Sequence, residues 1–192
     1  MKKVILIFAF FYILFILIGS DFIKEQGVFI DADGNKYKTV KIGEQIWMAE
    51  NLKVTKDRDG NPIQSYCFND DEKNCEKYGR LYTWDVALKL APEGWHLPSD
   101  EEWKVLVDFL GGSNVSGKEL AVGGSTGFEA FLAGGADFRG NYLYQDEYAL
   151  IWSSTETSDE RAYHQHVGKD GSSDHFAAMK GARISVRLLK DK

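Results

Sequence analysis

The hydrophobic pattern begins with one continuous apolar run and then changes to short alternating segments. The run spans 4–18, follows the basic residues Lys2 and Lys3, and ends in two small residues at 19–20. A basic start, an apolar middle and a small-residue end are typical of a secretory signal peptide, and the run is shorter than the roughly 20 residues of a spanning helix. The sequence therefore predicts a cleaved signal peptide over residues 1–20, with a retained N-terminal anchor as the alternative.

Alternation of hydrophobic and polar residues starts after a polar lead-in at residues 21–27. From 28 to 46 the pattern favours paired strands, with Asp33 and Gly34 as a turn between β-branched and aromatic residues. The segment 67–75 is rich in Asn, Asp and Lys, so we expect a surface loop there. The first part of the chain thus predicts a hairpin followed by a loop.

Helical spacing of apolar residues occurs twice in the middle of the chain. Residues 83–90 predict a short helix. A second helix is predicted to start after Ser99, which forms an S-x-x-E capping box with Glu102, and to end at 111–112. Its buried side is expected to consist of Trp103, Val105, Leu106, Phe109 and Leu110. Trp95 is also expected to be buried, because aromatic residues at such density usually form a core scaffold.

The last third of the chain is glycine-rich and predicts short strands. The candidates are 128–132, 149–152, 161–167, 175–179 and 183–189. Residues 169–171 supply a turn between two of them. Together with the two central helices, these short antiparallel strands predict an α+β fold in which the first and last strands pair.

Charge changes the picture by excluding one class of partner. The chain has 23 basic and 29 acidic residues, and loss of residues 1–20 would remove only two lysines, leaving a net charge of −8. An acidic domain repels phosphate backbones, so we expect no nucleic-acid partner. Contact with a membrane is expected only through the N-terminal segment, if that segment is retained.

The two cysteines, Cys67 and Cys75, both follow the predicted export signal. In an oxidising compartment a lone pair at this spacing indicates a disulfide. The alternative is a metal-binding pair, but zinc sites use closer cysteines and two further ligands nearby. The disulfide is therefore the favoured prediction.

Several sequence words in a fixed order carry a family resemblance. They are DADGNKYKTVKIGEQIWMAENL at 31–52, YGRLYTW at 78–84, GWHLPSDEEW at 94–103, GF at 127–128, WSSTE at 152–156 and ISVRLLKD at 184–191. These words resemble the Fibrobacter succinogenes major paralogous domain, a family of exported bacterial proteins. The resemblance implies a single C-type-lectin-like domain over residues 28–192, distantly similar to the formylglycine-generating enzyme group.

That enzyme group works through cysteines late in its fold, and this chain has no cysteine after Cys75. The family's usual SVRC ending is here Ser185-Val186-Arg187-Leu188, so a second disulfide at that end is also excluded. Function has to be argued from the site rather than the fold, and the formylglycine-generating activity is therefore not expected. No cofactor is indicated.

A segment at 137–148 mixes aromatic rings with acids, amides and one arginine. Sugars stack on flat rings while carboxylates and amides hold their hydroxyl groups, so this composition suits a ligand-binding loop. The candidate residues are Asp137, Arg139, Asn141, Tyr142, Tyr144, Asp146 and Tyr148. The alternative is that the tyrosines are strand residues packed on the core. The expected partner is a glycan or a cell-surface protein.

Histidines supply a weaker candidate for metal chemistry. His164 and His166 lie two residues apart, which places both imidazoles on one face of a strand. With His175 or Asp174 across a hairpin, three ligands would suffice for a metal site. The alternative is an exposed edge of polar side chains.

These observations predict an exported cell-envelope or secreted protein that acts as a non-catalytic binding or adhesion module. Two alternatives remain at this point. One is a metal-assisted enzyme that uses His164 and His166, and the other is a structural envelope protein that associates with itself.

Overall fold

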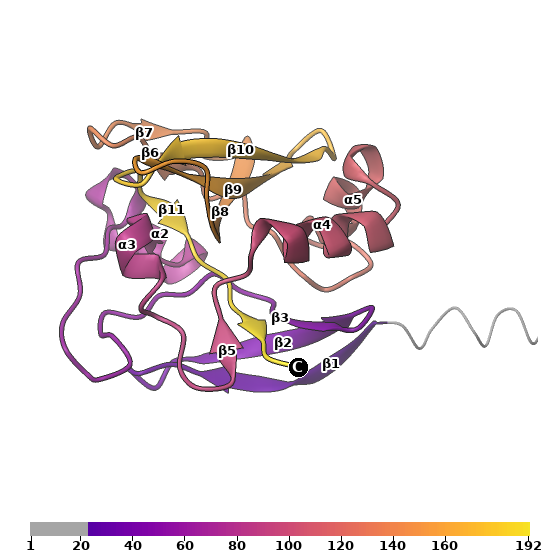
Figure 1. The fold of residues 1–192 in the computed structure, drawn as a ribbon, viewed down its shortest axis with the longest axis horizontal. Coiled ribbons are helices and arrows are strands. Elements are labelled where there is room, and N and C mark those ends of the chain that lie inside the picture. The colour runs from indigo at the N-terminus through magenta and orange to yellow at the C-terminus, as the bar shows by residue number, and fades with distance from the viewer. Residues whose placement is uncertain (1–22) are drawn as a thin grey trace, which may run out of the picture.

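The computed structural model describes residues 23–192, in which two five-stranded sheets lie on opposite sides of the molecule (Figure 1). One sheet has the order β1-β2-β3-β12-β5 and is antiparallel throughout. Its strands are β1 (Ile23–Ile30), β2 (Lys36–Ile42), β3 (Gln45–Met48), β12 (Leu189–Lys190) and β5 (Trp95–His96). The predicted signal peptide, residues 1–20, lies outside the described residues.

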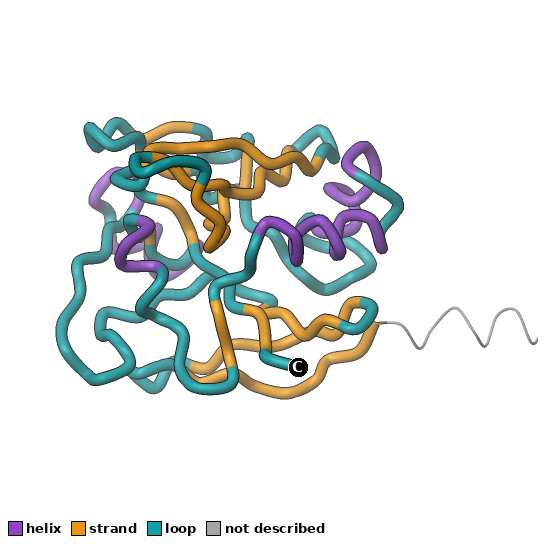
Figure 2. The backbone as a smooth tube through the Cα atoms, viewed as in Figure 1, coloured by secondary structure: helices purple, strands orange, loops and turns teal. Residues whose placement is uncertain are grey.

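The second sheet has the order β10-β9-β8-β11-β4, with one parallel pair between β8 and β11. Its strands are β10 (Ser173–Met179), β9 (Arg161–Gly168), β8 (Tyr148–Glu156), β11 (Ile184–Ser185) and β4 (Leu81–Tyr82). A small hairpin of β6 (Gly135–Ala136) and β7 (Tyr142–Leu143) stands beside this sheet (Figure 2). The α+β class is therefore confirmed.

Short helices flank the two sheets. They are the 3-10 turn η1 (Phe68–Asp70), α2 (Glu72–Tyr78), α3 (Trp84–Ala87), α4 (Asp100–Phe109) and α5 (Ser113–Leu120). Among residues 23–192, no helix has both the length and the hydropathy that crossing a bilayer requires.

The predicted lead-in at 21–27 is wrong from Ile23 onward, because β1 begins there. Ile23 pairs with Ile42 on β2, and the register shifts at a bulge between Glu25 and Gly27. A bulge inserts one unpaired residue into a strand and breaks its alternation. The residues before 28 therefore show no alternation of hydrophobic and polar positions, although their backbone pairs with β2.

The C-terminal strand joins the N-terminal sheet, but through a different partner from the one expected. Leu189 on β12 pairs with Trp47 on β3, whereas β1 stays at the edge of the sheet. The predicted strand 183–189 is also two strands, β11 and β12, which belong to different sheets. Between them the chain crosses from one sheet to the other.

Helix α4 carries the predicted capping box. The Ser99 side chain accepts a hydrogen bond from the Glu102 amide, and the Glu102 carboxylate accepts one from the Ser99 amide. However, Val105 is 51% and Phe109 46% exposed, so their predicted burial is wrong. At 3.6 residues per turn both positions lie on the side of the helix opposite Trp103.

Two helices were missed in the sequence. The predicted surface loop around the cysteines contains α2, whose N-cap Asp71 accepts a hydrogen bond from the Lys73 amide. Helix α5 contains Gly117, and a Cβ added there would lie 2.2 Å from the backbone oxygen of Ser172. A glycine is needed at this position because the helix packs closely against the β9–β10 turn, and this glycine weakens the helical pattern of the sequence.

Tryptophan rings fill both hydrophobic clusters of the core. Trp47, Trp103 and Trp152 are at most 1% exposed, and the Trp47 and Trp103 ring centroids lie 4.6 Å apart. The predicted burial of Trp103 is confirmed, while Trp95 is only partly buried and packs against Phe29. The rings at the middle of the chain therefore build the frame.

Cys67 and Cys75 form a disulfide, as predicted. Both cysteines are buried, and the bond closes residues 67–75, which contain η1 and the first turn of α2. Because the two sulfur atoms bind each other, they are not available as the metal-binding pair considered above.

Candidate functional site

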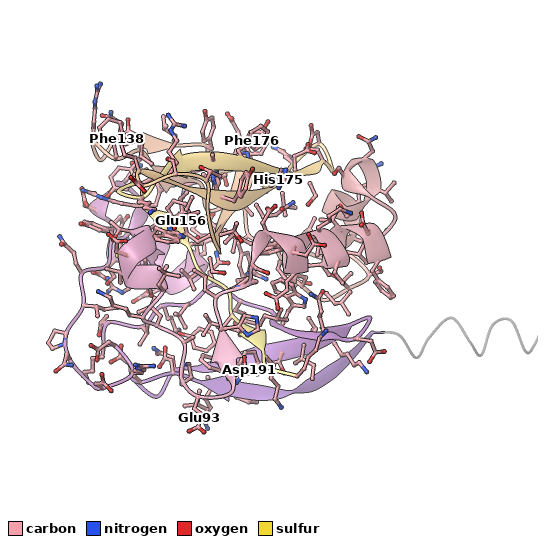
Figure 3. All side chains as sticks on the ribbon, in the orientation of Figure 1. Glu93, Phe138, Glu156, His175, Phe176 and Asp191 are labelled. Atoms are coloured by element: carbon pink, nitrogen blue, oxygen red, sulfur yellow. A yellow bond between two sulfur atoms is a disulfide. The ribbon has the colours of Figure 1, made fainter. Side chains whose placement is uncertain are left out.

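An open groove of about 380 Å³ lies between the β6–β7 hairpin and one face of the β8–β9–β10 sheet. We call it the aromatic groove. It is lined by Gly135, Ala136, Asp137, Leu143, Tyr144, Leu150, His164, His166, Phe176, Ala178, Ala182 and Ile184. Phe138 and Phe176, both about half exposed, lie at the same edge of the molecule (Figure 3). The groove brings the predicted ligand segment and the predicted histidine pair into one site.

The strand register explains why these side chains share a face. In the β9–β10 hairpin, Phe176 is paired with His164 and Asp174 with His166. Directly paired residues of antiparallel strands point to the same side, and alternate residues point to opposite sides. Phe176 is therefore placed beside the imidazoles, which the sequence pattern alone had not suggested.

Asp137 and Asn141 form the turn of the β6–β7 hairpin. The Asp137 carboxylate accepts hydrogen bonds from the amides of Arg139 and Asn141 and from the Asn141 side chain, at 2.8–2.9 Å. These bonds, above all those from Asn141, lower the pKa of Asp137. The same D-x-x-G-N turn occurs at 31–35 and 57–61. Both side chains thus shape the loop, and most of their hydrogen-bonding capacity is used within it.

Tyr142 faces the disulfide segment instead of the groove. Its ring centroid lies 5.0 Å from that of Phe68, and its hydroxyl donates a 2.7 Å hydrogen bond to Asp70. Gln145 also donates to Asn74 on α2. The candidate segment is therefore held against the part of the chain that the disulfide closes.

Tyr144 and Tyr148 form one end of the groove. Their rings meet edge to face with centroids 5.6 Å apart, and Tyr148 lies 5.3 Å from the His166 ring. His166 in turn lies 4.6 Å from Phe176. Tyr144 is 47% exposed and has a φ of 66°, a conformation that non-glycine residues rarely adopt. These rings form a continuous aromatic surface.

The remaining candidates of the segment lie outside the lining. Arg139 is exposed with its guanidinium 5.1 Å from the Phe138 ring, and Asp146 is exposed on the turn after β7. Of the seven predicted ligand residues, the structure thus brings two into the lining, Asp137 and Tyr144, and places Tyr148 against it.

His164 and His166 face each other in the groove, with their Nε2 atoms 2.7 Å apart. Burial lowers the pKa of His164 to about 3, and the neighbouring His166 adds to that effect. Burial likewise lowers the pKa of His166 to about 4, although Asp174 acts in the opposite direction. Both imidazoles are therefore neutral at physiological pH, and one of them donates its Nε2–H to the Nε2 lone pair of the other.

His175, predicted as a third ligand, lies on the opposite face of the sheet. It is paired with Gln165, so it shares that residue's face and not that of His164. Its Nδ1 is 2.7 Å from the Asp100 carboxylate, and its ring stacks on Tyr163 at 4.9 Å. The three histidines therefore do not share one site.

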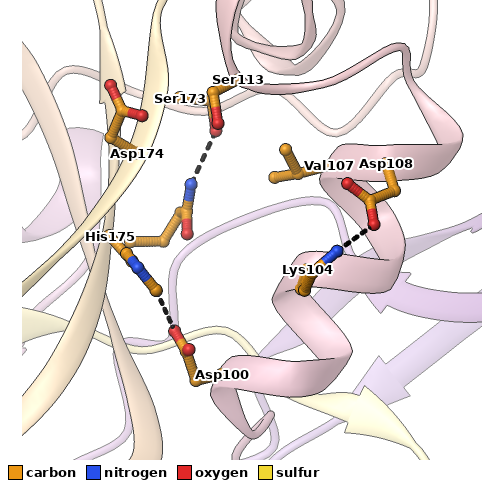
Figure 4. Close-up of a pocket in the computed structure, with 9 residues that line it drawn as sticks. Asp100, Lys104, Val107, Asp108, Ser113, Ser173, Asp174 and His175 are labelled. Carbon is orange, nitrogen blue, oxygen red and sulfur yellow. Dashed lines mark hydrogen bonds and ion pairs between the residues drawn. The ribbon is translucent and has the colours of Figure 1, made fainter.

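His175 instead lines a second cavity of about 240 Å³ between the sheet and helices α4 and α5 (Figure 4). We call it the polar pocket. Its lining residues are Asp100, Lys104, Val107, Asp108, Ser113, Gln165, Ser173, Asp174 and His175. Lys104 pairs with Asp108, and the buried Gln165 donates to Ser173. The polar groups of this pocket are largely paired with one another.

Within residues 23–192, the one cluster of three metal-ligand side chains consists of Cys67, Glu72 and Cys75. Its two sulfur atoms form the disulfide, so this cluster is not a metal site.

Comparison with known proteins assigns the chain to a family. A search of curated proteins and a search of solved structures each found no match. The family model of the Fibrobacter succinogenes major domain matches residues 40–190, which is most of the chain. The protein belongs to the Fibrobacter succinogenes major domain family.

Proposed function

We propose that the protein is an exported, non-catalytic binding module of the bacterial cell envelope, with the aromatic groove as its ligand site. The observation that supports this most is the row of partly exposed rings formed by Tyr144, Tyr148, His166 and Phe176. Exposed apolar rings gathered in a concavity are a common feature of binding sites. The ligand class that suits them is a glycan or a cell-surface protein.

The backbone of the groove wall supports the same proposal. Tyr144 and Asp146 both have positive φ values, of 66° and 62°. Such conformations cost free energy and persist where the surrounding structure enforces them, often at ligand sites. Here the Asp146 amide donates to the Leu132 backbone, and the Asp137 turn closes the hairpin before it. The backbone that carries Tyr144 is thereby fixed at the rim before a ligand arrives, which reduces the entropy lost on binding.

We further propose that the fold is of the C-type-lectin-like type. The C-terminal strand returns to the N-terminal sheet, and a long segment of little regular structure, 121–147, precedes β8. In lectin-like folds such a central segment usually carries the ligand contacts. The aromatic groove has this segment as one wall.

Binding rather than catalysis is supported by the environment of Ser153, the serine that follows Trp152 on β8. Ser153 is fully buried, and its hydroxyl accepts a hydrogen bond from the Thr155 amide. Its carbonyl accepts a hydrogen bond from the Trp84 indole. Ser153 is therefore held within strand β8 in the core, where a substrate cannot reach it.

A glycan array with the full chain tests the proposal, followed by titration of the best-bound glycan. Tyr144→Ala combined with Phe176→Ala removes two rings of the groove and should weaken binding at least about tenfold, because each ring–sugar or ring–apolar contact contributes about 1 kcal/mol or more. Phe109→Ala is the matched control, since Phe109 is a comparably exposed ring on α4.

The melting temperature of the double variant should stay close to that of the wild type, because both side chains are about half exposed. Equal glycan binding by the double variant and the wild type would count against the groove as the site. A monomer–dimer equilibrium abolished by the same double variant would favour self-association instead, and sedimentation velocity measures it.

A further inference from the structure

We infer that His164 and His166 together bind a divalent transition-metal ion, Zn²⁺ or Cu²⁺, at the floor of the aromatic groove. Their Nε2 atoms converge at 2.7 Å, and both side chains line the groove. Neutral imidazole nitrogen is a preferred ligand of both ions. The ion site stands on the geometry of the pair alone, whereas its role in ligand capture rests on the proposed function.

The separation of the two nitrogens is close to what a shared ion requires. Zinc lies about 2.0–2.1 Å from each imidazole nitrogen in tetrahedral sites, which places two such nitrogens about 3.3 Å apart. The observed pair would have to open by roughly 0.6 Å, which is within reach of a small rotation of the half-buried His166 ring. No backbone movement is needed, because the two residues already point to one side of β9.

The state of the buried ring favours Nε2 as the ligand atom. His164 is 5% exposed, and its Nδ1 makes no hydrogen bond of good geometry, although the backbone of Phe176 is near enough to favour a proton on the ring. With a proton on Nδ1, His164 accepts at Nε2 the hydrogen bond that His166 donates from its own Nε2. An ion between the two nitrogens takes the place of that proton, and His166 then carries its proton on Nδ1, the state in which metal-bound histidines commonly occur.

The surroundings leave the remaining coordination positions open. The two histidines lie between the rings of Trp152, Tyr148 and Phe176 and face an open groove. Two protein ligands fill half of a tetrahedral shell, so water or a donor atom of a bound molecule would complete it. Asp174 is on the same face of the hairpin as His166 and adds negative charge near the ion.

An ion at this position would give a largely apolar groove its polar anchor. The Asp137 carboxylate is engaged by its own turn, which leaves few groups in the lining to hold a charged ligand. A zinc ion with open positions also binds carboxylate oxygens, as it does those of Asp and Glu. Acidic glycans and acidic side chains of a protein are therefore ligands that suit the site.

Titration calorimetry of the full chain, purified without a histidine tag, tests the ion site with Zn²⁺ and with Cu²⁺ alone. We expect one equivalent to bind, and His166→Gln to weaken that binding at least about tenfold, because one of the two protein ligands is lost. His175→Gln is the matched control: it removes a histidine from the opposite face of the same hairpin and should leave the affinity unchanged.

His166 is chosen over His164 because it is the less buried of the two, so its variant is expected to fold; equal melting temperatures in EDTA verify this. The inference is overturned if the wild type binds neither ion, or if His166→Gln and His175→Gln lose binding equally.

Repeating the glycan titration in EDTA separates the two proposals. Retained glycan binding by a protein that takes up no ion would contradict the ion site and leave the groove intact.

Discussion

At the scale of single residues, the sequence motifs that carry the family resemblance contain side chains that stabilise the core. Arg187 is fully buried, and its guanidinium donates to Asn51 and to the backbone oxygens of Phe128 and Glu129. Burial lowers its pKa to about 9, which still leaves it charged at neutral pH. It fixes the 126–130 segment to the sheets, and the strand predicted at 128–132 is therefore absent: two of the carbonyls that a ladder would use accept from Arg187.

Replacing Arg187 with methionine should lower the free energy of unfolding by about 3–5 kcal/mol, because three buried acceptors lose their donor together. Urea denaturation measures the change. Arg139→Met is the matched control, since Arg139 is exposed, and it should shift stability by less than about 0.5 kcal/mol. Equal effects of the two substitutions would show that the buried network contributes little.

The histidine pair illustrates what residue spacing reveals and what it does not. The i, i+2 spacing of His164 and His166 was sufficient to predict a shared face, and the structure brings them together. The position of His175 depends on the hairpin register, and the turn predicted at 169–171 is sufficient to derive that register. Positions equally far from Asp170 are paired, so 176 lies opposite 164 and 175 opposite 165. Applying that symmetry would have identified Phe176 as a groove residue.

At the scale of elements, segments with a clear apolar pattern were located from the sequence, whereas the short polar helices α2 and α5 were not. Helix α4 and strands β8, β9 and β10 form close to their predicted ranges. Helix α2 was hidden because it is short and polar and is stabilised by a cap and by the disulfide at Cys75 rather than by an apolar face. A short helix depends on such tertiary contacts, since isolated short helices are marginal in water.

Ser99→Ala should lower the free energy of unfolding by about 1 kcal/mol through loss of the N-cap of α4. The effect is expected to be local, because the Glu102 carboxylate keeps its contact with His96 at 3.0 Å. Ser113→Ala serves as the control: Ser113 is the first residue of α5 and follows the cap position. Chemical denaturation compares the two variants, and equal stabilities would show that the capping box contributes nothing measurable.

At the scale of the whole molecule, the C-terminal sheet separates two cavities of opposite character. One face carries the aromatic groove with its neutral histidines, and the other carries the polar pocket against α4 and α5. The sequence indicated the class of fold and the loop beside the groove. It did not indicate the pocket, which depends on how α4 and α5 pack against β9 and β10 rather than on any local pattern.

The buried histidines should make the protein sensitive to acid. Their pKa values of about 3 and about 4 lie below the value of about 6.5 expected in the unfolded chain. At pH values between these limits, the unfolded state therefore binds more protons than the folded state. The contribution of these histidines to the free energy of unfolding should therefore be fully present above about pH 6.5. It should decrease as the pH falls toward about 4, by up to about 1.4 kcal/mol per pH unit for His164.

Urea denaturation at several pH values in the presence of EDTA measures this slope. His164→Gln combined with His166→Gln should flatten it, because the groups that gain protons on unfolding are gone. An unchanged slope in the double variant would place the acid-sensitive groups elsewhere.

The D-x-x-G-N turn at 137–141 has a consequence for which positions beside the groove can be changed. Its hydrogen bonds run between Asp137 and residues no more than four positions away, so the turn folds from local information. The intervening Phe138 and Arg139 are exposed and contribute none of their side-chain atoms to these bonds. Substitutions at these two positions should therefore leave the scaffold intact, so that a library randomised at 138 and 139 would present many different surfaces beside the groove on one unchanged turn.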